Sequence, residues 1–207
     1  MRRLTRNSFT EKYLRFTEET NALDYLERAG EFIQRALTDP KAWKWVVLSL
    51  HGALYGFAIV ACKTSNPSSI VKTTKKGHER LITLDEALEM CKDANWMGTL
   101  YGGIPLNVSA RQADSIRRLK ETLRNNFEHY IPSLWLIELH GMPQIAIDIL
   151  NVIRFLAIET FRYQHLNQSQ ERKIRSIIFQ SKKLLTKSAL HLESLEMNRS
   201  NGSEQTF

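Results

Sequence analysis

The sequence predicts an all-α fold, a single bundle of five to six helices, from three observations. Apolar residues recur every three or four positions in several long segments, which places them on one face of an α-helix. Capping-box patterns precede two of these segments, and no segment longer than a few residues alternates with period two. With 207 residues and 43% hydrophobic content, the chain is long enough to bury one core.

We expect three regions along the chain. Residues 1–12 form an N-terminal basic segment, residues 13–192 form the helical bundle domain, and residues 193–207 form a disordered polar tail. The basic start runs directly into polar residues, without the apolar stretch and small-residue cleavage site of a secretion signal.

The first two helices are expected over residues 13–37 and 40–61. Asp39-Pro40 separates them, because aspartate caps a helix and proline at the first helical position loses no hydrogen bond. The second helix carries no charge from Trp45 to Cys62, a stretch just long enough to cross a membrane. Polar residues and glycines dilute it and no second span accompanies it, so we expect a buried central helix and no membrane association.

A loop is expected over residues 64–77, which are rich in serine, threonine and lysine and have no period. Thr83 and Glu86 then form a capping box in front of a short third helix. Residues 96–105 form the next irregular stretch, and their glycines do not follow a phosphate-binding pattern. No cofactor is therefore expected.

Three helices are expected in the second half of the chain. Ser109 and Gln112 form a capping box for the first of them, which ends before Pro132. The other two span about residues 144–159, apolar nearly all round, and 169–190, which carries many basic residues. The predicted core stripe of the first of these helices is Ile116, Leu119, Leu123, Phe127 and Tyr130.

The charge balance favours a polyanionic partner. The chain has 29 Lys+Arg against 22 Asp+Glu, a formal net charge of +7, which is typical of proteins that bind nucleic acid without being specific to them. Cys62 and Cys91 are neither paired in sequence nor near a histidine at ligand spacing. We therefore expect no disulfide framework, no metal site and a cytoplasmic location.

Arg124, Asn125 and His129 are the candidate catalytic residues. A fixed cation with a polar residue behind it and a histidine, a side chain that can transfer protons near neutral pH, suit phosphodiester chemistry. In a straight α-helix Arg124 and His129 would lie roughly 140° apart, both on the half facing away from the core stripe. The alternative is a surface Arg124–Glu128 pair with His129 as a cation at a helix end. About one such Arg-to-His spacing is expected by chance, so the spacing alone does not decide.

Arg124-Asn125, three further residues and then His129 near the end of a bundle helix resemble the signature of the HEPN superfamily. A looser likeness to small bacterial HEPN-like proteins extends over about residues 13–190. It rests on Ala42-Trp43-Lys44-Trp45 with His51, on the segment LRNNFEHYIPSLWLI at 123–137, and on Gly141-Met142-Pro143 before an apolar helix.

The resemblance implies a metal-independent endoribonuclease of toxin or defence type, a homodimer that cleaves RNA in a composite site. His129 would transfer protons, Arg124 would hold the phosphate, and Asn125 would orient one of these groups. The alternative is a non-catalytic HEPN-like module that binds a nucleotide or a partner and regulates it. Any antitoxin or nucleotidyltransferase partner would be a separate chain. We expect His51, Trp43 and Trp45 to belong to the core and assign none of them to the site.

Overall fold

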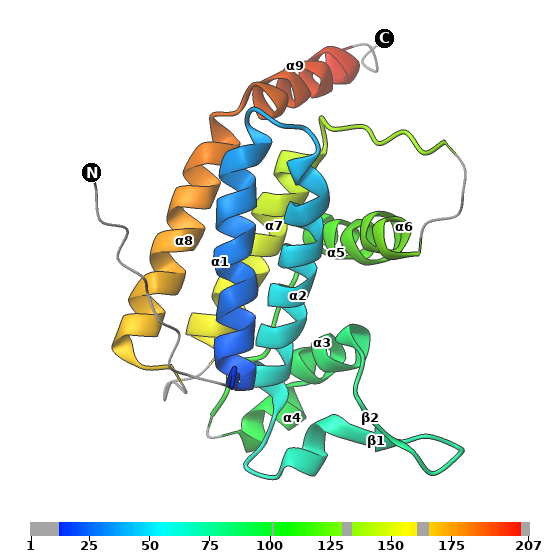
Figure 1. Ribbon diagram of the computed structural model, residues 1–207, viewed down its shortest axis with the longest axis vertical. Coiled ribbons are helices and arrows are strands. Elements are labelled where there is room, and N and C mark those ends of the chain that lie inside the picture. The colour runs from blue at the N-terminus through cyan, green and yellow to red at the C-terminus, as the bar shows by residue number, and fades with distance from the viewer. Residues whose placement is uncertain (1–12, 101, 130–133, 161–165, 204–207) are drawn as a thin grey trace, which may run out of the picture.

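The computed structural model describes residues 13–100, 102–129, 134–160 and 166–203, with the backbone alone for 198–203. Four helices form a bundle (Figure 1): α1 (Glu18–Ala36), α2 (Ala42–Cys62), α7 (Met142–Arg154) and α8 (Gln168–Thr186). Helix α1 packs on α2 and α8, and α7 packs on the same two helices. The described part of the chain is therefore mostly helical, as the sequence predicts.

The remaining elements lie around this bundle. The α2–α3 connection holds the 3-10 helix η1 (Pro67–Ile70) and the strands β1 (Val71–Thr73) and β2 (Glu79–Leu81). Then follow α3 (Leu84–Lys92), α4 (Ala94–Thr99), α5 (Ala110–Arg117), the π-helical segment η2 (Arg118–Arg124) and α6 (Asn125–Glu128). A second π-helical segment, η3 (Phe155–Glu159), extends α7, and α9 (Ala189–Ser203) follows α8.

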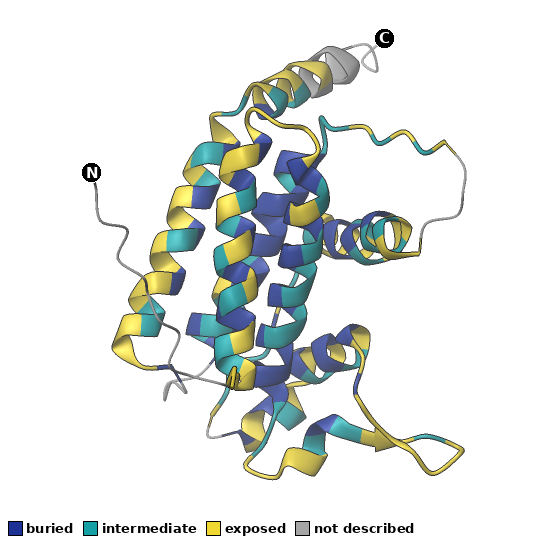
Figure 2. Ribbon diagram, viewed as in Figure 1, coloured by how far each residue is buried: buried dark blue, intermediate teal, exposed yellow. Residues whose placement is uncertain are grey.

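Helix α2 lies at the centre of the core, and most of its residues are buried (Figure 2). Its glycines permit close packing against α1. A Cβ atom on Gly56 would lie 2.7 Å from the Cβ of Ala22, and one on Gly52 would lie 2.6 Å from the ring of Tyr25. Real Cβ atoms do not approach this closely, so these two glycines let the helices come together.

Within the described residues, α2 alone is long and apolar enough to cross a membrane. About two thirds of its most apolar window, 67%, is buried inside the protein. The prediction that this segment forms a buried central helix is confirmed.

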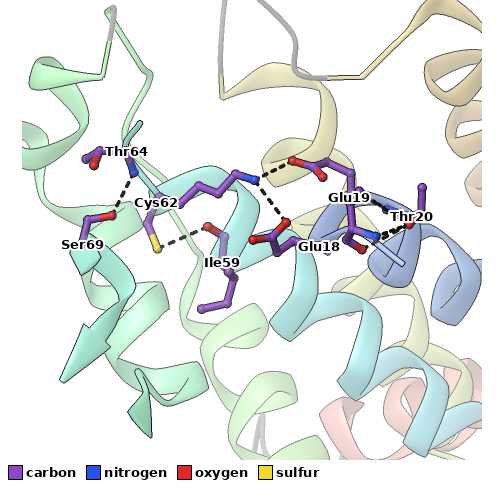
Figure 3. Close-up of polar contacts among 9 residues, drawn as sticks. Glu18, Glu19, Thr20, Ile59, Cys62, Thr64 and Ser69 are labelled. Carbon is purple, nitrogen blue, oxygen red and sulfur yellow. Dashed lines mark hydrogen bonds and ion pairs between the residues drawn. The ribbon is translucent and has the colours of Figure 1, made fainter. Parts of the chain in front are cut away.

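A salt-bridge clamp joins the start of α1 to the end of α2. Lys63 Nζ donates to Glu19 Oε1 at 2.7 Å and lies 3.5 Å from Glu18 Oε2. In Figure 3, dashed lines join Glu18 and Glu19 to a side chain that extends from the end of α2, next to Cys62. The carboxyl groups also lie in the first turn of α1, where the helix dipole favours negative charge. Cys62 itself is buried and carries a free thiol, as does Cys91.

The expected loop over residues 64–77 is wrong in part, because the structure places η1 and a β-hairpin there. Val71 pairs with Leu81 and Thr73 with Glu79 in antiparallel register. Gly77 has φ +80°, a conformation that glycine adopts without steric cost, and it closes the turn. The hairpin extends away from the bundle (Figure 1).

Several helix boundaries differ from those expected. Helix α1 begins at Glu18 rather than near residue 13, because Thr17 and Thr20 form its capping box. Helix α4 (Ala94–Thr99) overlaps the 96–105 stretch expected to be irregular, with Asp93 accepting hydrogen bonds at its start. Helix α9 occupies 189–203, which corrects the expected disordered tail over 193–203. Residues 1–12 and 204–207 lie outside the described part of the chain.

Candidate functional site

The candidate residues lie at the end of one continuous helical rod, formed by α5, η2 and α6 and called here the motif rod. Both hydrogen bonds of the predicted capping box are present at its start. Ser109 Oγ accepts from the Gln112 N–H at 3.2 Å, and Gln112 Oε1 accepts from the Ser109 N–H at 2.9 Å. The rod packs on α2 and α7 and leaves the bundle at its far end (Figure 1).

The middle of the motif rod is π-helical, which the sequence did not predict. In a π-helix each N–H bonds to the carbonyl five residues back, so the turn is wider than in an α-helix. The predicted core stripe is nevertheless confirmed: Ile116, Leu119 and Leu123 are buried and Phe127 packs against the core, while Tyr130 lies outside the described residues. The π-helical segment ends at Arg124, and such segments occur frequently at functional sites.

Arg124 is held in place by its own helix. Its Nη1 donates to Asn125 Oδ1 at 3.0 Å, and its Nη2 forms an ion pair with Glu128. The side chain is 30% exposed. Its Nε is buried and has no hydrogen-bond partner within the described part of the chain. The Arg124–Glu128 pair expected as the alternative is therefore present, but it does not use all the donors of the guanidinium.

His51 of α2 lies close enough to Arg124 to feel its charge. Burial lowers the pKa of His51 below its ordinary value, and the positive charge of Arg124 lowers it further. Lys120 also lowers this pKa, whereas Glu128 and Asp85 have opposing effects. The ring is partly buried and forms no hydrogen bond with any described residue. The expected place of His51 in the core is therefore met only in part, because His51 is of intermediate burial and lies within reach of the charges of Arg124 and Glu128.

His129 lies at the end of the rod and is exposed. Its backbone N–H donates to Asn125 O at 2.8 Å, and its φ of −114° and ψ of 56° end the helix. Among the described residues, none forms a hydrogen bond or ion pair with its ring. Asn125 therefore bonds to both Arg124 and His129, through its side chain and its backbone respectively, whereas no hydrogen bond joins Arg124 to His129.

An extended segment, residues 134–139, returns from the end of the rod towards α7. Trp135 packs edge-on against Phe127, with ring centroids 5.0 Å apart. Side chains alternate along the segment: Trp135, Ile137 and Leu139 pack on the core, whereas Leu134 and Leu136 are 88% and 82% exposed. The outward face of this segment therefore presents two leucines to solvent next to the candidate residues.

A cavity of about 400 Å³ lies between this segment and the start of α2. Its walls are mostly apolar and include Phe127 of the rod, and two lysines also line it. Trp43 is buried, as expected, but Trp45 is 49% exposed and stacks on Phe32, so the expectation that both tryptophans belong to the core is wrong for Trp45. The lining residues are Pro40, Lys41, Trp43, Lys44, Trp45, Phe127, Ile137, Leu139 and Met142.

A second arginine–carboxylate pair lies at the start of the motif rod. Asp148 of α7 is fully buried, and it accepts hydrogen bonds from Arg111 Nε at 3.1 Å, Ser115 Oγ at 3.0 Å and Gln144 Nε2 at 3.0 Å. These contacts join α5 to α7 and satisfy a charge that would otherwise be costly to bury. Asp148 thus fixes the base of the rod.

No group of three or more His, Cys, Asp or Glu side chains in the described ranges is arranged to hold a metal ion. Comparisons with protein-family models, with curated proteins and with solved structures find no match to this chain. The class that the fold itself defines is a mostly helical protein with a small two-stranded hairpin.

Proposed function

We propose that this chain is a HEPN-like endoribonuclease of toxin or defence type, which cleaves RNA without a metal ion through Arg124, Asn125 and His129. The observation that supports it most is the arrangement of Arg124: its guanidinium is oriented by Asn125 and Glu128, yet its buried Nε–H has no partner among the described residues. A bidentate guanidinium is the group that proteins use to hold phosphate oxygens.

The chemistry assigned to these residues is transfer of the phosphoryl group within the RNA strand. Neutral His129 takes the proton of a ribose 2′-hydroxyl, and that oxygen attacks the adjacent phosphorus. The bond from phosphorus to the 5′-oxygen breaks as the new bond forms, and this oxygen receives a proton from a protonated histidine. The products end in a 2′,3′-cyclic phosphate and a 5′-hydroxyl, while Arg124 offsets the charge on the phosphate oxygens.

One histidine is not enough for both proton transfers at once, so we place the site between two copies of the chain. In a two-fold dimer, each copy brings the end of its motif rod to a shared cleft, where one His129 accepts a proton and the other donates one. The exposed faces of Leu134 and Leu136 adjoin the end of the rod and offer apolar surface for such an interface.

The experiment that tests the proposal incubates purified protein with a single-stranded RNA in EDTA. We expect cleavage to products ending in 2′,3′-cyclic phosphate, and a loss of about 10²–10⁴-fold in His129→Ala, the range for removing a general acid or base. The matched control is His78→Ala, an exposed histidine in the hairpin, which should cleave as the unmodified chain does. Equal cleavage by His129→Ala would refute the assignment.

A non-catalytic HEPN-like module that binds a nucleotide or a partner is the second candidate, and one observation favours it. Glu128 already pairs with Arg124 Nη2, so within one chain that nitrogen is not free for a phosphate. RNA binding without cleavage by the unmodified protein, unchanged in His129→Ala, would support this second candidate. Co-purification with a separate antitoxin or nucleotidyltransferase chain would identify the partner that such a module serves.

A further inference from the structure

A groove runs between α7 and α8, and we call it the α7–α8 groove. It has a volume of about 440 Å³, within the range of sites that bind small organic molecules. Six of its seven lining residues come from α8 and one from the end of α7. The lining residues are Arg154, Arg175, Ile178, Phe179, Lys182, Lys183 and Thr186.

The groove follows one face of α8. Arg175, Phe179, Lys182 and Thr186 are three or four residues apart, the spacing that aligns side chains along a helix. Ile178 is 2% exposed and forms the floor. Phe179 is 64% exposed, so its ring stands in solvent between cations one turn away on either side. An aromatic ring in this setting offers a flat apolar face beside positive charge.

The cations of the groove are held by neighbouring groups. Lys182 Nζ donates to Asn151 Oδ1 at 2.7 Å, Arg154 lies 2.9 Å from Glu159, and Arg175 lies 2.6 Å from Glu171. Lys183 is exposed and forms no ion pair with a described residue. Four cations against two carboxylates leave the groove positively charged.

We propose that the α7–α8 groove binds single-stranded nucleic acid, with one base stacked on Phe179 and the flanking phosphates held by Lys182, Lys183 and Arg175. Single strands are bound in this way because every base has a flat face and every link carries a phosphate. A duplex keeps its bases stacked inside and cannot offer one to Phe179. Charge complementarity and the exposed ring thus favour the same ligand.

The groove is separate from the candidate catalytic residues. Helix α8 lies on the opposite side of α1 and α7 from α5 and α6 (Figure 1). A strand in the groove therefore does not reach Arg124 or His129 across the bundle of the same chain. Binding in the groove is a property of its own, and it does not depend on the proposed cleavage.

The test measures fluorescence anisotropy of a labelled uridine 12-mer RNA and of the matching thymidine DNA, both in EDTA. The full chain carries His129→Ala so that the RNA stays intact, and the same titrations are repeated without that change. We expect Phe179→Ala to weaken binding about tenfold or more and Phe179→Trp to preserve it, as removal of one stacked base does elsewhere. Lys183→Ala should lower the slope of log affinity against log salt by about 0.7, one phosphate contact on a single strand.

The matched control is Lys173→Ala, which removes the same charge from the same helix but outside the groove, where Lys173 pairs with Glu27 at 2.6 Å. The Lys173→Ala variant should bind the labelled strands more tightly than the Phe179→Ala variant does. If Phe179→Ala loses binding of only one labelled strand, the groove binds that kind of nucleic acid, RNA or DNA. If it loses binding of both strands, the groove binds both kinds. Three results would overturn the proposal. They are no binding by the protein with an unmodified groove, binding by Phe179→Ala as tight as that protein's, or a dimer of the protein that Phe179→Ala dissociates. These experiments measure binding and not cleavage, so their outcome does not depend on whether the protein cleaves RNA.

Discussion

The two ends of the motif rod carry the same kind of ion pair in opposite settings. At its start, Arg111 meets Asp148, whose carboxylate is fully buried and also accepts from Ser115 and Gln144. At its end, Arg124 meets Glu128 one turn away, and both side chains are partly exposed. The first pair joins two helices, whereas the second stays within one helix.

The difference lies in which hydrogen-bonding groups are left over. All three donor side chains around Asp148 are directed at one carboxylate, so this end of the rod is a fixed support. Around Arg124 a buried Nε–H has no described partner, and a histidine with a lowered pKa lies across the interface on α2. Buried polar groups without partners are rare and cost free energy, which makes the far end the candidate for function.

The largest expected effect distinguishes the two arginines by activity. Arg124→Lys keeps the charge but loses the planar fork, so we expect RNA cleavage to fall about 10²–10³-fold, as for loss of one donor to a developing oxyanion. Arg111→Lys, the same change at the other end, should cleave within about twofold of the unmodified chain. Initial rates in EDTA measure both. Equal losses of cleavage in Arg124→Lys and Arg111→Lys would contradict a special role for the Arg124 end of the rod.

The next effect distinguishes the two carboxylates by stability. Asp148→Asn removes the charge that Arg111, Ser115 and Gln144 share, and we expect the free energy of unfolding to fall by roughly 2 kcal/mol, the scale of hydrogen bonds to a charged group. Urea unfolding followed by circular dichroism measures it. Glu128→Gln should change stability by less than about 0.5 kcal/mol, because a partly exposed pair in one helix contributes little. A similar loss in both variants would contradict the distinction.

A smaller effect of Glu128→Gln is expected on binding. Without its carboxylate, Arg124 Nη2 is free for a phosphate, so RNA should bind up to about fivefold more tightly, the energy of one exposed ion pair. Titration of labelled RNA with His129→Ala protein, with and without Glu128→Gln, gives the ratio. Weaker binding after the change would show that Glu128 helps to hold the strand rather than competing with it.

Local signals in the sequence predicted much of the fold. The capping boxes at Thr83 and Ser109 form with both hydrogen bonds, because they depend on residues only three positions apart. The core stripe of the motif rod follows from helical spacing in the same way. Other features depend on contacts that no local pattern records. Each strand of the hairpin has three residues, too few to alternate visibly, and a π-helical segment changes backbone hydrogen bonds without requiring particular side chains.

The candidate site was predictable as a list of residues and not as an arrangement. Arg124, Asn125 and His129 lie within six consecutive residues, but His51 comes to them through packing of α2 on the rod. One signal could have found it: a lone imidazole in the uncharged stretch from Trp45 to Cys62 is a polar group that needs a nearby partner. Phe179 offered a similar signal for the α7–α8 groove, because it is an aromatic residue among the basic residues of the last predicted helix.

The smallest expected effect tests whether His51 belongs with Arg124. Burial, and then the charge of Arg124, holds the pKa of His51 below its ordinary 6.5, so the unfolded chain takes up this proton at a higher pH than the folded chain. The corresponding stability is present above pH 6.5 and is lost as pH falls towards the lowered pKa. We expect the melting temperature to fall less between pH 7 and pH 5 in His51→Gln than in the unmodified chain. Arg124→Ala should raise the pKa of His51 and so reduce the fall in melting temperature when His51 is present. In the His51→Gln background, Arg124→Ala should not change that fall further. Additive effects of the two changes would separate His51 from the end of the rod.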